Sequence, residues 1–282
     1  MRYHPHVMAD SPSADAAFKT FEHEGWEKVA LPYREAFSSL TCQAIPPLLG
    51  AVGAAAGVRL LDVACGPGDA AAAATKRGAQ ATGVDFANAM VEQASRLYPG
   101  SAFRVGDAEA LPFPEAAFDA VVINFGVLHF ADPDGALAEA HRVLRPGGRL
   151  AFTAWAPPEK AVGFAIVLEA IERHGRLDVP VPEGPPFFRF ADPDESRRAL
   201  GVAGFTRAQV RELPLRWRLP EPDALLDAFL EGGVRTRGVL RAQTPAALGA
   251  IREAIQVAAR RHAHAGGVEF PMPAVMSAAE KG

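Results

Sequence analysis

The sequence predicts an α/β protein with an open, mostly parallel sheet of seven strands and helices on both faces. Short apolar runs rich in β-forming residues alternate with helical stretches from residue 58 to residue 155. The first run ends in a glycine turn, Cys65 to Gly68, and an alanine-rich helix begins at Asp69. Two more apolar runs follow at 205–213 and 274–279. Strands that alternate with helices pair in parallel, because each crossover helix packs back on the sheet.

The N-terminal part is predicted to be helical. Aromatic residues recur at helical spacing between residues 16 and 40. Pro32 interrupts this pattern, which favours two short helices over one long helix. A further short helix is predicted at 43–49, before the first strand.

The strand at 58–64, the glycine turn and the next helix form a corner typical of nucleotide binding. Glycine lets a ligand approach the backbone, and a helix N-terminus presents free N–H groups. Gly66, Gly68 and Ala71 also fit the dinucleotide pattern G-x-G-x-x-A. The corner alone indicates a nucleotide-like cofactor without selecting one.

Polar residues follow the carboxyl ends of the other core strands. The run 79–84 ends at Asp85, at the distance from the glycines where such folds place an acid that binds the ribose hydroxyls. The run 102–105 leads into Asp107, and 120–123 ends at Asn124. Because the carboxyl ends of parallel strands meet at one edge of a sheet, we expect these residues to form one site.

We expect one domain with three parts. The parts are residues 1–50, an N-terminal helical lid; residues 51–155, the cofactor-binding core; and residues 156–282, the remaining strands with a C-terminal helical cap.

The composition limits the classes of partner. The chain has 282 residues with 49% hydrophobic residues and a net charge of -4, so no global basic field attracts nucleic acid or a membrane surface. Its two cysteines fit a reducing compartment, and no apolar run reaches membrane-spanning length. We expect a cytoplasmic protein. No metal is expected, because the pairs His4/His6 and His262/His264 lack supporting ligands.

The stretch L-L-D-V-A-C-G-P-G from Leu60 to Gly68 resembles the first motif of class I S-adenosylmethionine-dependent methyltransferases. Later motifs follow in order and at the usual spacing: Asp85, Gly106-Asp107-Ala108 with Leu111-Pro112-Phe113, Phe118-Asp119, and Leu144 to Gly148. The resemblance covers residues 58–155. It implies a Rossmann-like fold, S-adenosyl-L-methionine as cofactor, S-adenosyl-L-homocysteine as product, and a small-molecule methyl acceptor.

The resemblance also implies roles for individual residues. Asp62 would orient the glycine loop, Asp85 would bind the ribose, and Asp107 would accept a hydrogen bond from the adenine amino group. The other cofactor-binding residues that it implies are Ala64, Gly66, Gly68, Phe86, Met90, Ala108, Asn124 and Phe125. The chain departs from the family at Ala87, where relatives often carry a serine that caps the next helix; Asn88 is the expected substitute.

The acceptor side is predicted from aromatic residues and one histidine. His129, just past the fourth strand, is the candidate general base for an acidic acceptor; the alternative is that it fixes its own loop. The arginine-rich stretch 207–241 is interpreted as a solvated face, or else as a site for an acidic substrate group. An apolar or aromatic acceptor pocket is expected from Trp26, Tyr33, Phe37, Trp155, Phe187 and Trp217.

The predicted function is methyl transfer to an oxygen, nitrogen or carbon atom of a small molecule, driven by positioning and desolvation. Two alternatives stay open at this point. One is a non-catalytic S-adenosylmethionine-binding protein. The other is an NAD-dependent oxidoreductase, which the G-x-G-x-x-A pattern and Asp85 permit.

Overall fold

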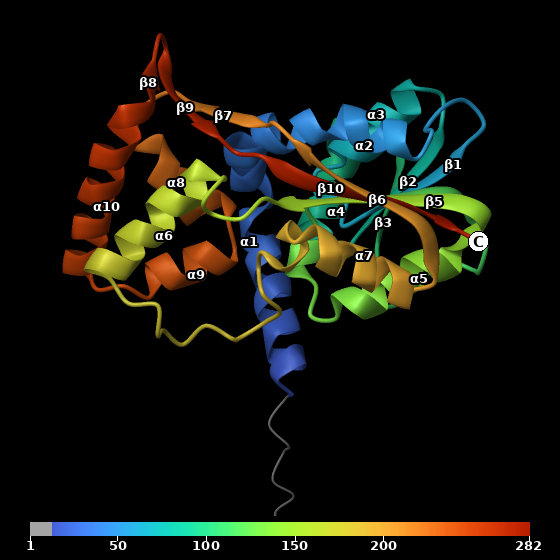
Figure 1. The fold of residues 1–282 in the computed structure, drawn as a ribbon, viewed down its shortest axis with the longest axis horizontal. Helices are drawn as coiled ribbons and strands as arrows, with labels where there is room; N and C mark the ends of the chain where they lie inside the picture. The colour runs from blue at the N-terminus through green and yellow to red at the C-terminus, as the bar shows by residue number, and fades with distance from the viewer. Residues whose placement is uncertain (1–12) are drawn as a thin grey trace, which may run out of the picture.

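A computed structural model describes residues 13–282 and contains a seven-stranded sheet in the order β3-β2-β1-β4-β5-β10-β6 (Figure 1). Strands β1 to β5 pair in parallel, whereas β10 is antiparallel to both β5 and β6. The open, mostly parallel sheet predicted from the sequence is therefore confirmed. Its strands are β1 (Arg59–Val63), β2 (Gln80–Asp85), β3 (Ala102–Val105), β4 (Phe118–Asn124), β5 (Leu144–Trp155), β6 (Phe205–Leu213) and β10 (Ala274–Lys281).

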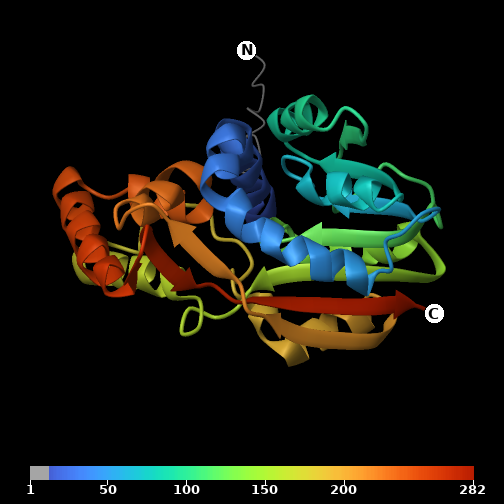
Figure 2. The ribbon, with the colours of Figure 1, turned by 90° about the horizontal axis from the view of Figure 1, so that it is seen from above.

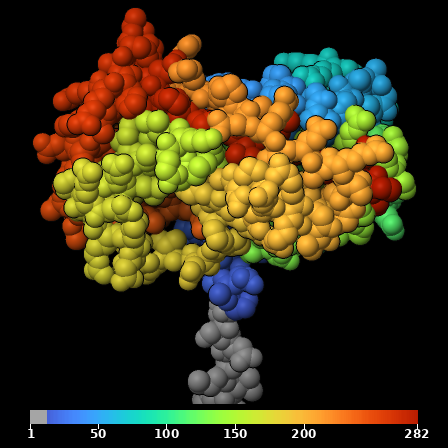
Figure 3. All heavy atoms as spheres, viewed as in Figure 1, coloured from blue at the N-terminus to red at the C-terminus, as the bar shows by residue number. Residues whose placement is uncertain are grey.

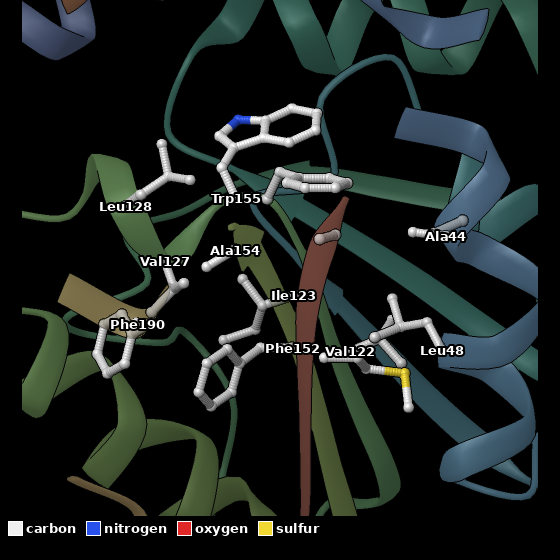
Figure 4. Packing of buried hydrophobic residues seen from close by; sticks show 14 of the residues in the cluster. Ala44, Leu48, Val122, Ile123, Val127, Leu128, Phe152, Ala154, Trp155 and Phe190 are labelled. Carbon is white, nitrogen blue, oxygen red and sulfur yellow. The ribbon is translucent and has the colours of Figure 1, made fainter. Parts of the chain in front are cut away.

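Helices cover both faces of this sheet. Figure 1 shows α2 and α3 on one side and α5 and α7 on the other. Between these layers, Leu48 packs near Val122 on one face of the sheet, and Phe152 meets Phe190 on the other (Figure 4). Because parallel strands are buried on both faces, the inner positions of β1 and β4 are mostly apolar, with Leu60, Leu61 and Val63 in β1 and residues 120–123 in β4. The covering helices are α2 (Ile45–Ala51), α3 (Asp69–Lys76), α4 (Asn88–Leu97), α5 (Pro133–Val143) and α7 (Pro193–Val202).

The N-terminal segment forms one helix, α1 (Ala14–Thr41), so the prediction of two short helices was wrong. Pro32 lies inside it and removes one backbone hydrogen bond. The helix continues because buried residues anchor it on both sides of the proline, with Phe18 before it and Phe37 after it. Packing on both halves outweighs the local cost of the proline.

Residues beyond β5 complete the large sheet and form a second group of elements. The strands β7 (Arg216–Leu219), β9 (Gly267–Pro271) and β8 (Ala263–His264) make a small antiparallel sheet. The sequence did not predict it, because β7 pairs with a strand far along the chain, with Arg216 opposite Pro271. This sheet lies with four helices on the side of α1 away from the large sheet (Figure 2). Those helices are α6 (Val162–His174), α8 (Ala224–Gly232), α9 (Arg235–Arg241) and α10 (Pro245–Ala259).

Helix α1 is therefore enclosed between two bodies. It contacts α4 beside the large sheet and α8 in the C-terminal group. From the side shown in Figure 3, later parts of the chain cover most of α1, and only its N-terminal end projects. No helix within residues 13–282 has the length and apolar character that crossing a membrane requires.

Candidate functional site

A large cavity lies at the carboxyl ends of β1, β2 and β4, the edge predicted from the sequence. It holds about 1320 Å³ of empty space, a volume that includes open solvent at its mouth. The predicted residues that line it are Trp26, Tyr33, Phe37, Asp62, Ala64, Gly66, Asp85, Phe86, Met90, Asp107, Ala108, Asn124, Phe125, His129, Trp155 and Phe187.

Two residues predicted for the site do not line the cavity. Gly68 has a φ of +88°, and a Cβ atom there would lie 2.7 Å from the ring of Phe103. This glycine allows close packing under the turn. Trp217 is 0% exposed, stacks on Phe37 with 4.8 Å between ring centroids, and donates from Nε1 to the Ala36 carbonyl oxygen at 3.3 Å. It joins the small sheet to α1.

Gly66 is the glycine that opens toward the cavity. Its φ is +50°, and no atom lies within 4 Å of the position that a Cβ would take. Its N–H donates to Oδ2 of Asp85 at 2.9 Å, which holds the turn against the end of β2. A ligand can therefore approach this backbone closely, as binding of an amino-acid or nucleotide group requires.

The glycine pair gives a matched test. Gly66→Ala adds a methyl group that projects into the cavity, so we expect S-adenosylhomocysteine to bind at least about tenfold more weakly, with the free energy of unfolding lowered by only about 1–2 kcal/mol of backbone strain. Gly68→Ala adds the same strain plus a clash with Phe103, so we expect about 2–4 kcal/mol lower stability. Calorimetry and urea unfolding separate the two effects; equal effects of both variants on affinity would contradict this assignment.

Two buried carboxylates stand beside the glycine turn. Asp85 accepts from the Gly66 and Ala87 N–H groups, each at 2.9 Å, and burial raises the pKa of Asp85 to about 6. Asp62 accepts from the Ala71 N–H at 2.9 Å, and its other oxygen has no hydrogen-bond partner among residues 13–282. Burial raises the pKa of Asp62 to about 8. Through this hydrogen bond Asp62 ties β1 to α3.

The raised pKa of Asp62 has a consequence for stability. The folded state keeps the proton up to about pH 8, whereas the unfolded chain releases it near the ordinary value of 3.8. Binding of this proton therefore favours the folded state. Its contribution to the free energy of unfolding is complete below pH 4 and is lost as the pH rises toward 8. Relative to Asp62→Asn, the unfolding free energy of the wild type should fall by up to about 1.4 kcal/mol per pH unit. Urea unfolding at pH 5, 6 and 7 checks this; parallel pH profiles for the two proteins would contradict it.

Helix α1 is joined to the predicted adenine side by charged contacts. Lys19 lies 2.5 Å from Oδ2 of Asp107 and 2.7 Å from Oε2 of Glu109. Oε1 of Glu109 accepts from the Ala131 and Asp132 N–H groups. Neither Lys19 nor Glu109 was predicted for the site, because no local motif connects them.

Helix α1 also caps α4. Ala87, at the N-cap, provides no side-chain hydrogen bond. Asn88 does not replace the missing serine, since its side chain donates to Glu92. Instead, Glu27 accepts from the Asn88 and Ala89 N–H groups at 2.6 and 3.0 Å. A residue of α1 thus satisfies the free N–H groups beside Asp85.

The end of β4 is held by a short polar network. Thr153 on β5 donates to Oδ1 of Asn124 at 2.9 Å and accepts from the Phe125 N–H at 2.9 Å. Phe125 has a φ of +57°, and its ring stacks on Trp155 with 4.0 Å between centroids. Ala64, at the end of β1, has a φ of +52°. A left-handed conformation is strained for a residue other than glycine and persists only where surrounding contacts hold it. Such residues cluster at functional sites.

The far wall of the cavity is aromatic and contains residues that the sequence analysis missed. Phe164 and Phe229 contribute rings, and Arg235 contributes a guanidinium group. Arg235 alone of the seven arginines at 207–241 lines the cavity. The arginine-rich stretch was the only sequence signal for it. Glu22, behind this wall, lies 3.0 Å from Nδ1 of His129.

The comparisons with known proteins agree with this geometry. The family described as "Methyltransferase domain" matches residues 61–152. A demethylmenaquinone methyltransferase of Thermus thermophilus is 47% identical over 115 residues, which are 39% of this chain and 52% of that protein. One of Mycolicibacterium paratuberculosis is 34% identical over 169 residues, which are 57% of this chain and 72% of that protein.

A solved structure extends the comparison of folds. Phosphoethanolamine N-methyltransferase 2 of Haemonchus contortus, in complex with phosphomonomethylethanolamine and S-adenosylhomocysteine, superposes with a TM-score of 0.57 at 19% identity, covering 94% of this chain and 60% of that one. At this identity the likeness concerns the fold.

The share of each relative that this chain covers decides whether the match shows the family. The chain spans about half the length of several curated relatives that it matches, with 50%, 52% and 47% of three of them covered. One relative is matched over 72% of its length at 34% identity. With the family match over the core and the observed sheet order, this identifies the chain as a member of the class I S-adenosylmethionine-dependent methyltransferases.

Proposed function

We propose that this chain transfers a methyl group from S-adenosylmethionine to a small, apolar, ring-containing acceptor. One observation carries the proposal. The residues that the family resemblance assigns to the cofactor and the aromatic residues expected for the acceptor line one continuous cavity. Methyl transfer needs this arrangement, because the nucleophile must meet the methyl carbon in line and away from water.

The residues present fit the cofactor. Gly66 leaves its backbone open, and Asp85 places a carboxylate at the end of β2, where hydroxyl groups of a ribose would find an acceptor. Asp107 and Ala108 follow the end of β3 and line the same cavity as Met90. S-adenosylmethionine supplies an activated methyl group when bound. The chain's own part is to bind it, to orient the acceptor with stacked Phe125 and Trp155, and to exclude water with α1.

The acceptor class is supported by the wall of the cavity and by the relatives. Trp26, Tyr33, Phe164 and Phe187 offer ring faces and edges to an apolar molecule. Two relatives are named demethylmenaquinone methyltransferases, and an acceptor of similar apolar ring character suits this wall. The free thiols of Cys42 and Cys65 fit our expectation of a reducing, cytoplasmic setting.

Calorimetry tests the proposal. We expect micromolar binding of S-adenosylhomocysteine and S-adenosylmethionine to the purified chain and no comparable binding of NADH. Binding of NADH alone would instead favour an oxidoreductase. Acceptor turnover is then followed with radiolabelled methyl groups over hydroxylated naphthalenes and quinols. Tight cofactor binding without turnover of any acceptor would favour a non-catalytic binding protein.

A further inference from the structure

A buried glutamate lies behind the acceptor side of the cavity. Glu22 of α1 is 0% exposed. Its Oε2 atom accepts from Nε1 of Trp26 at 2.9 Å and lies 3.0 Å from Nδ1 of His129. Its Oε1 atom is buried without a hydrogen-bond partner among the residues that the structure describes. Such burial is costly for a carboxylate and is typical of functional sites.

The contact orients the histidine. A carboxylate at Nδ1 requires the proton on that nitrogen, which leaves the lone pair on Nε2. Within residues 13–282, Nε2 makes no hydrogen bond, and His129 lines the cavity. The ring is held by edge contacts with Trp26 at 4.8 Å and Phe187 at 6.0 Å between centroids. An oriented imidazole thus presents a free base to the acceptor side.

The positively charged side chain of Arg235 lies at the same wall of the cavity. Arg235 donates from Nη1 to the Pro185 carbonyl at 2.9 Å, and its guanidinium carbon lies 5.1 Å from the Phe18 ring centroid and 5.4 Å from that of Phe187. No carboxylate of residues 13–282 lies within ion-pairing distance of it. Burial lowers its pKa, but a guanidinium remains charged at neutral pH. Glu22 acts on Arg235 electrostatically but forms no ion pair with it, so the aromatic rings and this cation together favour an apolar molecule with an anionic oxygen.

From this geometry we infer that the acceptor is an apolar ring that bears an ionisable hydroxyl group, such as a phenol, enol or hydroquinone. His129 is the general base that removes the hydroxyl proton, and Glu22 is the positioning residue of His129. Arg235 binds the oxyanion that results. The inference rests on the proposed function and narrows its acceptor class. A structural alternative is that Glu22 and His129 only fasten α1 to the core.

The proton and electron balance is complete. Nε2 of His129 takes the hydroxyl proton, and the electron pair of that O–H bond stays on the oxygen or on the conjugated ring carbon. In transfer to oxygen, that pair forms the O–CH3 bond. In transfer to a ring carbon, the conjugated pair forms the C–CH3 bond, and the C–H proton of that carbon then passes to the oxygen, which restores the hydroxyl group. In both cases the carbon–sulfur pair stays with sulfur. The imidazolium then returns its proton to solvent. Besides Glu22, the carboxylate of Asp85 lies within electrostatic range of His129, and Glu22 lies within electrostatic range of Arg235.

Ionisation of a bound probe tests the inference without turnover. The probe is 4-nitro-1-naphthol, whose neutral and anionic forms absorb at different wavelengths, and its methyl ether is the matched ligand without a hydroxyl group. Both are titrated into the full chain with and without saturating S-adenosylhomocysteine. In the wild type we expect the apparent pKa of the bound naphthol to fall by at least about one unit, a tenfold preference for the anion. His129→Gln, Glu22→Gln and Arg235→Gln should each remove most of this shift, with ether affinity changed less than about threefold.

The controls separate the possible outcomes. Glu24→Gln changes an exposed glutamate of the same helix and should behave as wild type. If Glu22→Gln weakens ether and S-adenosylhomocysteine binding together while the naphthol stays as ionised as before, Glu22 only fastens the helix and the inference is overturned. It is also overturned if the wild type binds the naphthol without preference for the anion, or not at all. Failure of S-adenosylhomocysteine binding in calorimetry counts against the proposed function instead.

Discussion

Asp85→Ala should weaken the binding of S-adenosylhomocysteine by about 30- to 1,000-fold, because hydrogen bonds to a charged group contribute about 2–4 kcal/mol when two are lost. The carboxylate also holds the Gly66 N–H at 2.9 Å, so its removal loosens the turn that faces the ligand. Burial raises the pKa of Asp85 to about 6. Wild-type affinity should therefore fall as the pH drops from 7 to 5, since the protonated acid is a poorer acceptor.

Calorimetry at pH 5, 6 and 7 measures both effects. Asp119→Asn is the matched control, because Asp119 pairs with Arg59 and Arg145 outside the cavity. It should bind S-adenosylhomocysteine as the wild type does. An Asp85→Ala protein that keeps its affinity, or an affinity independent of pH in the wild type, would remove Asp85 from the cofactor site.

Trp217→Ala should lower the free energy of unfolding by about 3–5 kcal/mol, the usual cost of emptying the space of a large buried aromatic. The indole is fully buried between Phe37 and Phe229, with ring centroids 4.8 and 5.8 Å away. It joins β7 to α1, so the lost free energy comes from the packing between these two elements, outside the cavity. Urea or thermal unfolding measures the change.

Trp217→Phe is the matched variant. It keeps a stacked ring and loses the hydrogen bond to the Ala36 carbonyl, so its cost should be nearer about 1–2 kcal/mol. Because Trp217 does not line the cavity, the affinity of either folded variant for the naphthol probe should change less than about threefold. A large loss of probe affinity with unchanged stability would return Trp217 to the acceptor pocket, as the sequence predicted.

The core and its cofactor edge were predictable because their signals are local. The bounds of β3 and β6 agree with the apolar runs at 102–105 and 205–213. Glycine spacing and the acid at the end of β2 are likewise read within a short window. In contrast, the small sheet escaped prediction, because its central pairing joins distant parts of the chain, with Arg216 of β7 opposite Pro271 of β9.

The sequence by itself determined the family, the order of strand and helix in the core, and the edge of the sheet where the site lies. The tertiary structure decided which residues meet there. Glu22 reaches His129 across 107 positions, Glu27 caps α4 across 61, and Trp217 meets Ala36 across 181. No local pattern encodes such contacts, because they arise only when α1 packs between the sheet and the C-terminal group and buries its polar residues against both.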